Sequence, residues 1–226
     1  MLQSLIELLT NNWQLIVDNT GISLYMVFVS TLFSYLFGLP LGILLIVTAP
    51  DGLHPMPMFS QILNVVVNLL RSIPFLILMF TIMPFTQMIT GSTFGANATI
   101  VPLIVSAAPF VARLIESSFK EIDFGIIEAA QSMGASNWQI ITKVMLPEAK
   151  PSLLIGTALA ATTILGYSAM AGAIGGGGLG DIAIRYGYYR GKPGLMYICV
   201  VLLVIFTQII QDAGLRISSK TDKRLH

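Results

Sequence analysis

Four of the long stretches of this chain that carry no Asp, Glu, Lys or Arg constrain its fold more than any other feature. A helix that crosses the ~30 Å hydrocarbon core of a membrane needs about 20 apolar residues. The stretch 72–112 is too long for one such helix and suits two, divided by Pro84 and the polar run 90–93. The other stretches are 19–50, 151–180 and 193–211. The sequence therefore predicts an all-α membrane protein with five transmembrane helices, near residues 22–47, 59–83, 98–118, 152–173 and 195–210.

Composition agrees with a surface that mostly faces lipid. Only 10% of the residues are charged and 55% are hydrophobic, whereas soluble domains carry about 25% charged residues. The net charge of +1 gives no basic excess for nucleic acid. One cysteine, Cys199, and two histidines offer no disulfide and no metal-ligand set. We expect no cofactor, no metal and no nucleic-acid partner.

The distribution of Lys and Arg predicts the orientation. No basic residue precedes the first span, whereas the tail after the fifth contains four. Four more are counted with the loop between the third and fourth spans, the first of them at the end of the third span: Arg113, Lys120, Lys143 and Lys150. By the positive-inside rule the N-terminus lies outside, and the long loop and the C-terminus are cytoplasmic. Arg185, Arg190 and Lys192 count against this assignment. The expected parts are an extracytoplasmic segment 1–19, a transmembrane domain 20–217 and a cytoplasmic tail 218–226.

The loop 119–150 is the longest polar segment between spans and has the pattern of two short helices. Asp123 is placed to N-cap the first, and Gly134 to end it in a left-handed conformation. The apolar residues of the first helix are expected on one face: Ile126, Ile127, Ala130 and Met133.

The second helix of this loop has the spacing of a capping box, from Ser136 to Gln139. It is expected to present Trp138, Ile141 and Met145 as a stripe and to stop before Pro147. Such a pair could receive a soluble partner or lie on lipid headgroups, and the pattern leaves both open. A DNA-binding helix-turn-helix has the same outline, but the balanced charge and the membrane tethers disfavour it.

The same loop resembles the EAA loop of ABC importer permeases. The resemblance rests on residues at fixed spacing, with Val144 where the family usually has isoleucine: Glu128, Ala129, Ala130, Gly134, Val144, Leu146 and Pro147. It implies a type I importer permease fold and a loop that docks on an ABC ATPase, with Glu128, Ala129 and Gly134 at the docking surface. It also implies a homodimer, two ATPase subunits and an extracytoplasmic binding protein, in a bacterial cell (inner) membrane.

Nucleotide-binding and catalytic motifs fail on context. Gly191-Lys192 is followed by Pro193, so no phosphate-binding loop is present and ATP hydrolysis is expected from a partner. The segment 175–180 matches G-x-G-x-x-G but follows no strand pattern, so we expect it to end the fourth span and pack closely. Around Ser168 there is a weak resemblance to a nucleophile turn, but both histidines lie outside the spans. The chain is not expected to be an enzyme.

Arg71 lies in or near the second span and has two explanations. A charge in the membrane is costly and should face protein or water, where it could gate a pathway or pair with an acidic group. Alternatively it snorkels to the interface. The string Arg-Ser-Ile-Pro at 71–74 also resembles an Arg-x-x-Pro of amino-acid-type importer permeases.

The fourth span is rich in Gly and Ala, which lets helices approach closely in lipid. Its end and the residues that follow, 166–180 and 186–188, together with 71–75 and 107–110, resemble methionine importer permeases. The resemblance implies import of methionine, L or D or both. Tyr167, Ser168 and Met170 become candidates for lining the pathway, with ordinary packing as the alternative.

Two other functions stay open at this stage. An importer of the same architecture could carry another amino acid or small solute. A stand-alone secondary transporter would need coupling carboxylates within the spans, and no acidic residue falls at the middle of an expected span.

Overall fold

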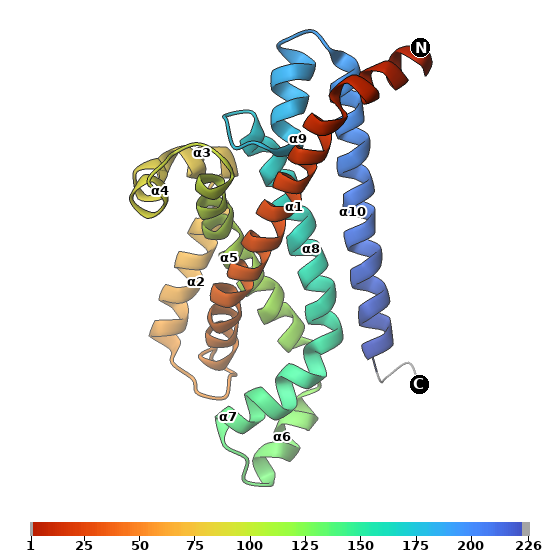
Figure 1. The fold of residues 1–226 in the computed structure, drawn as a ribbon. Helices are drawn as coiled ribbons and strands as arrows, with labels where there is room; N and C mark the ends of the chain where they lie inside the picture. Colours follow the sequence, from red (N-terminus) through yellow and green to blue (C-terminus); the bar gives the residue numbers. More distant parts are fainter. Residues whose placement is uncertain (1, 223–226) are drawn as a thin grey trace. The chain divides into compact units, whose positions relative to one another are not determined.

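The computed structural model describes residues 2–222, with side chains from Thr10 onward, and every regular element among them is a helix. Contacts divide the described chain into two compact units. Unit 1 contains the residues up to Leu32, Ile73–Ser106 and Ala161–Ile210. Unit 2 contains Phe33–Ser72, Ala107–Ala160 and the residues from Gln211 onward. Figure 1 traces the order of the helices along the chain.

The first helix, α1 (Leu2–Val47), begins about 20 residues before the expected span. Nothing in the residues before Gly21 breaks a helix, because Leu, Gln and Glu are good helix formers. A stretch without charged residues shows which part of a helix can lie in lipid, but it does not show where that helix begins. The segment 1–19 is helical from Leu2, and its extracytoplasmic location remains a prediction.

The second expected span, 59–83, is interrupted. Helix α2 (Pro57–Ser72) ends before Pro74, and α3 (Phe75–Thr81) begins after it, followed by α4 (Met83–Thr90). Proline lacks the N–H that a helix interior needs and disfavours the helical conformation at the residue before it. The expectation of one continuous helix for the second span was therefore wrong, although the position of Pro74 indicated the break.

The remaining spans lie on single helices. They are α5 (Ala96–Lys120), α8 (Leu146–Gly172) and α10 (Pro193–Thr221). With α1, the described residues contain four helices long and apolar enough to cross a membrane, or five spans if α2 and α3 count as one broken span. This agrees with the predicted fold class.

Unit 2 is built on a close approach of α1 and α5. A Cβ added to Gly38 would lie 2.7 Å from Val111 Cγ1, and one added to Gly42 would lie 2.7 Å from the carbonyl oxygen of Ala112. Glycine is therefore required at both positions for α5 to pack at this distance. The buried side chains Ile115 and Phe119 continue the core from α5 toward the long loop.

In unit 1, α9 (Gly178–Asp181) and η2 (Ile182–Tyr188), a helix with the wider π-type turn, follow the end of α8. Leu179 and Ile182 pack with Leu195 and Cys199 of α10 in a fully buried cluster. Cys199 is thus a core residue.

Candidate functional site

The first helix of the long loop, α6 (Phe124–Ser132), has both predicted ends. The Asp123 carboxylate accepts a hydrogen bond from the Gly125 N–H, at 2.7 Å. After the helix, Gly134 has φ +78°, and the N–H groups of Gly134 and Ala135 donate to the carbonyls of Gln131 and Ala130. This pair of bonds is the Schellman arrangement that a glycine in the left-handed conformation permits.

The second helix begins as predicted and ends much later. Ser136 accepts from the Gln139 N–H at 3.3 Å, and the Gln139 side chain accepts from the Ser136 N–H at 2.9 Å. However, α7 (Asn137–Gln139) continues through the π-helical segment η1 (Ile140–Met145) into α8, so the expected stop before Pro147 was wrong. In η1 the Leu146 N–H bonds to the carbonyl of Ile141, five residues back. This change of hydrogen-bond register lets the helix pass a residue that has no N–H to donate.

The two expected apolar stripes are each split between the core and the surface. Ala130, Ile141 and Met145 are buried against Phe119. Met133 and Trp138 are exposed over 81% and 72% of their surfaces, and Ile126 is also exposed. In the second stripe, the wider turn of η1 rotates Ile141 and Met145 away from Trp138, because residues no longer align at α-helical spacing. Expecting one continuous face on each helix was therefore wrong.

The buried half of these stripes shows what the loop packs on. Ile140 has no exposed surface, and Ile141 and Met145 have 7% and 2%. They contact protein in unit 2, so the loop has no need of lipid headgroups to cover its apolar core. Figure 1 shows α6 and α7 together beyond the ends of α5 and α8.

The residues of the EAA pattern fall into two groups. Glu128, Ala129, Gly134 and Pro147 lie on the exposed surface, whereas Ala130 is buried and Val144 and Leu146 are half-buried against the core. The first group is available to a partner, and the second holds the loop in place.

The four pathway candidates are divided between the two units. Within unit 2, the exposed Arg71 guanidinium lies 6.0 Å from the centre of the Phe110 ring, at the edge of cation–π range, and forms no salt bridge with a described residue. Within unit 1, Tyr167 stacks on Phe75, Ser168 is buried and donates to the Leu165 carbonyl, and Met170 is 47% exposed.

The glycine-rich segment follows the end of α8 at Gly172 and packs closely against it, as predicted. A Cβ at Gly180 would lie 2.1 Å from the carbonyl oxygen of Ala169, and one at Gly172 would lie 2.3 Å from the Asp181 nitrogen. Two side chains of α1 bind the turn: Asn19 accepts from the Gly178 N–H and Ser23 from the Leu179 N–H, at 3.2 and 2.9 Å. Neither acceptor was predicted from the sequence, because each lies more than 150 residues from its donor.

The basic segment after α9 is partly neutralised. Arg185 pairs with Asp181, one helical turn earlier. The guanidinium groups of Arg185 and Arg190 lie 5.2 and 4.4 Å from the centre of the Tyr186 ring. This segment therefore presents less free positive charge than its count of Lys and Arg suggests.

A charge cluster in α5 was missed at the level of sequence, where Arg113 was counted only as a loop charge. Glu116 accepts from Arg113 at 2.6 Å and from Lys120 at 2.7 Å. Arg113 also donates to the Asn68 side chain on α2, at 2.8 Å. The spacing 113, 116 and 120 places these charges on one helix face, which was the available signal.

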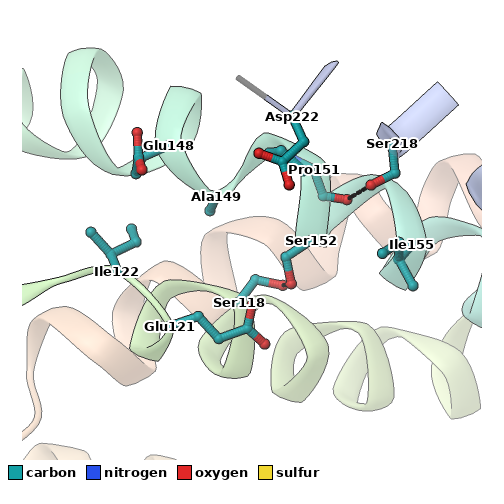
Figure 2. A pocket seen from close by; sticks show the side chains of 10 residues that line it. All are labelled: Ser118, Glu121, Ile122, Glu148, Ala149, Pro151, Ser152, Ile155, Ser218 and Asp222. Carbon is teal, nitrogen blue, oxygen red and sulfur yellow. Dashed lines mark hydrogen bonds between the residues drawn. The ribbon is translucent and has the colours of Figure 1, made fainter. Parts of the chain in front are cut away.

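A cavity of about 340 Å³ lies where α5, α8 and α10 meet in unit 2. Figure 2 shows hydroxyl and carboxylate groups around it, among them those of Ser118, Glu121 and Ser152. The Ser118 and Ser152 hydroxyls are hydrogen bonded at 2.9 Å, and Ser218 of α10 donates to the Pro151 carbonyl at 2.8 Å. These bonds join the start of α8 to both neighbouring helices.

Comparison with known proteins gives consistent matches over nearly the whole chain. A probable D-methionine transport system permease protein of Pasteurella multocida is 44% identical over 212 residues, which cover 94% of this chain and 98% of that protein. The methionine import system permease protein of Bacillus subtilis is 41% identical over 181 residues, covering 80% and 82%. A solved chain of the MetNI methionine ABC transporter in an inward-facing conformation superposes with a TM-score of 0.93 at 44% identity, covering 94% of this chain and 99% of that one.

Residues 38–216 match the sequence family described as binding-protein-dependent transport system inner membrane component. This range includes the long loop with its EAA pattern and most of the helices that could span a membrane. The chain therefore belongs to the family of inner membrane components of binding-protein-dependent transport systems.

Proposed function

We propose that this chain is the transmembrane permease subunit of an ATP-driven ABC importer that brings methionine into the cell. The observation that carries the proposal is the loop around Gly134. Its inner side is buried on α5, while Glu128 and Ala129 remain exposed to a partner. High identity to permeases named for methionine transport supports the substrate.

The assembly has two copies of this permease, two ATPase subunits and an extracytoplasmic binding protein, set in the bacterial inner membrane with its lipid. One copy supplies one loop, so two copies are needed to engage two ATPases. The N-terminus lies outside, and the loop and C-terminus are cytoplasmic. The parts are the segment 1–19, the permease domain 20–217 and the tail 218–226.

The permease moves its cargo without chemistry of its own. ATP binding brings the two ATPase subunits together and displaces the two loops, which shifts the permease between inward-open and outward-open states. ATP can shift this equilibrium only through its different affinity for the two states. The loop must therefore transmit force, and its burial on α5 gives it a firm base.

The docking surface comprises Glu128, Ala129 and Gly134, together with the exposed apolar residues Met133 and Trp138. Large apolar side chains exposed on a polar loop mark an interaction surface. Ala130, Val144 and Leu146 of the same motif pack in the core of unit 2 and hold this surface in place, whereas Pro147 is exposed at the end of the motif.

Tyr167, Ser168, Met170 and Arg71 are proposed pathway residues. Support is strongest for Met170, which is exposed, and for Tyr167, which is half-buried and presents an aromatic ring. Ser168 acts indirectly, because its hydroxyl is bonded within its own helix.

Uptake into proteoliposomes tests the function. Vesicles containing this chain, its ATPase and its binding protein should accumulate labelled methionine only with ATP inside. An excess of unlabelled L-methionine, D-methionine or other amino acids identifies the preferred substrate. If no methionine form competes but another solute does, the substrate assignment is wrong and an importer of the same architecture remains. Uptake that needs no ATPase would favour a stand-alone secondary transporter.

A further inference from the structure

The charge cluster of α5 lies within a helix that is long and apolar enough to span a membrane. Arg113 is seven residues before Lys120, where α5 ends, which is about 10 Å along the helix. The Arg113 and Glu116 side chains are only 18% and 11% exposed. Ionisable groups are costly to bury within a membrane span, and for this reason they mark functional positions.

Arg113 joins α2 and α5 by hydrogen bonds. Its Nη1 donates to Glu116 on α5 at 2.6 Å, and its Nη2 donates to Asn68 Oδ1 on α2 at 2.8 Å. The same Nη2 lies 3.4 Å from the carbonyl oxygen of Asn64. Nearby, Val67 of α2 packs against Leu45 and Ala112 in a small apolar cluster.

These two kinds of contact constrain motion differently. The hydrophobic effect is non-directional, so apolar contacts do not by themselves fix the angle between two side chains. Charge-assisted hydrogen bonds from a planar guanidinium fix both distance and angle. Arg113 therefore sets the register of α2 along α5.

The register matters because α5 leads directly into the loop. Only Glu121, Ile122 and the cap residue Asp123 separate the end of α5 from α6. A displacement of the loop thus reaches α5 through the chain itself, whereas no comparably short stretch of chain links the loop to α2. We propose that Arg113, held by Glu116, is a positioning residue that transfers movement of the loop from α5 to α2. The inference rests on the proposed transport function.

A second route to α2 exists in unit 2 and provides the competing explanation. The Asn137 side chain of α7 donates to the carbonyl of Leu53, in the segment that precedes α2, at 3.3 Å. If this bond carried the movement, Asn137→Ala would uncouple the importer and changes at Arg113 would not.

Two substitutions test Arg113 without leaving its charge unpaired. Arg113→Lys keeps the charge, but its single ammonium group cannot reproduce the planar fork that bonds Glu116 and Asn68 together. Asn68→Leu removes the acceptor on α2. The matched control is Gln61→Leu. It also replaces an amide side chain of α2 by leucine, at an exposed residue two turns before Asn68.

The first measurement is methionine transported per ATP hydrolysed in the reconstituted complex. Energetic coupling through such contacts is worth a factor of roughly 2 to 30, so Arg113→Lys and Asn68→Leu should lower the ratio by that much. Gln61→Leu and Asn137→Ala should leave the ratio unchanged, and all variants should copurify with the ATPase.

The second measurement does not depend on the substrate. A spin label at Val66→Cys, in a Cys199→Ala background, reports the distance between the α2 helices of the two copies with and without ATP. The parent should show an ATP-dependent change that Arg113→Lys and Asn68→Leu abolish. The inference is wrong if both variants keep the distance change that the parent shows. It is also wrong if they lose this change only when the ATPase no longer copurifies with them. Should the parent import no methionine, the substrate assignment fails, while the label still decides the role of Arg113.

Discussion

The rings of Phe75 and Tyr167 stack nearly parallel, with centroids 4.7 Å apart and planes 2° apart. Phe75 is the first residue of α3, directly after the break at Pro74, and Tyr167 lies in the last two turns of α8. The stack therefore fixes the short helix after the break against a long helix of unit 1. It places the proposed pathway residue Tyr167 in a defined orientation.

The first prediction concerns this stack. Tyr167→Ala should lower the stability of the permease by about 0.5–1.5 kcal/mol beyond its loss of buried area, and it should reduce uptake. Tyr167→Phe keeps the ring and should retain the parent's melting temperature. A loss of uptake in Tyr167→Phe at unchanged stability would assign the hydroxyl group to the pathway and not to packing.

The second prediction concerns Gly134. Its φ of +78° costs a residue with a Cβ about 1–2 kcal/mol, although the added Cβ would meet no atom within 4 Å. Gly134→Val should reduce methionine transported per ATP by roughly 5- to 30-fold, because the strained turn displaces the docking surface. Gly134→Asn should be milder, since Asn tolerates this conformation.

The control for Gly134 is Gly91→Val, which meets the same strain at φ +74° with no atom within 4 Å, away from the loop. It should hydrolyse ATP and transport with the parent's ratio. Wild-type uptake by Gly134→Val would refute the docking role of this turn.

The third prediction concerns the close approach at Gly180. A Cβ there would lie 2.1 Å from the carbonyl oxygen of Ala169, so Gly180→Ala should cost about 1–3 kcal/mol and lower the melting temperature. Gly166→Ala, in α8 with no atom within 4 Å of the new Cβ, should be neutral or slightly stabilising. Equal melting temperatures for the two variants would contradict the close packing.

The fourth prediction concerns Ser23, which accepts the Leu179 N–H at 2.9 Å. Ser23→Ala leaves a buried donor unpaired, at a cost of about 1–3 kcal/mol. Hydrogen exchange at the Leu179 amide should become faster. Ser219→Ala, whose hydroxyl bonds only within its own helix, should leave that exchange rate unchanged.

The fifth prediction concerns Trp138, which is 72% exposed on the loop. An aromatic anchor at the centre of an interface is typically worth 2 kcal/mol or more, so Trp138→Ala should weaken ATPase binding by roughly 30-fold. Binding of the purified ATPase to the permease in nanodiscs measures this. Tyr188→Ala removes a ring that is equally exposed but lies in η2, and should bind as the parent does.

Local features of this chain were predictable because their causes are local. Asp123, Gly134 and the Ser136–Gln139 capping box each act on backbone groups within five residues, and all three formed as the sequence indicated. The number of spans was also predictable, since the bilayer requires about 20 apolar residues for each crossing.

Other features depended on competition between local signals. Pro74 ended α2, whereas Pro147 and Pro151 were carried within continuous helix. For Pro147 the difference lies in the preceding turn, because the wider turn of η1 rearranges the hydrogen bonds before it. A single sequence does not show which proline will find such compensation.

The sequence by itself determined an α-helical membrane protein with a polar loop of two short helices, because charge spacing and helix capping act along the chain. Only the tertiary structure decided which side of that loop faces a partner. Ile141 and Met145, in the π-helical segment η1, are buried in the core, whereas Trp138, just before this segment, is exposed. Likewise, Arg113 changed from a loop charge into a link between α2 and α5, because Asn68 lies 45 residues away in sequence and only 2.8 Å away in space.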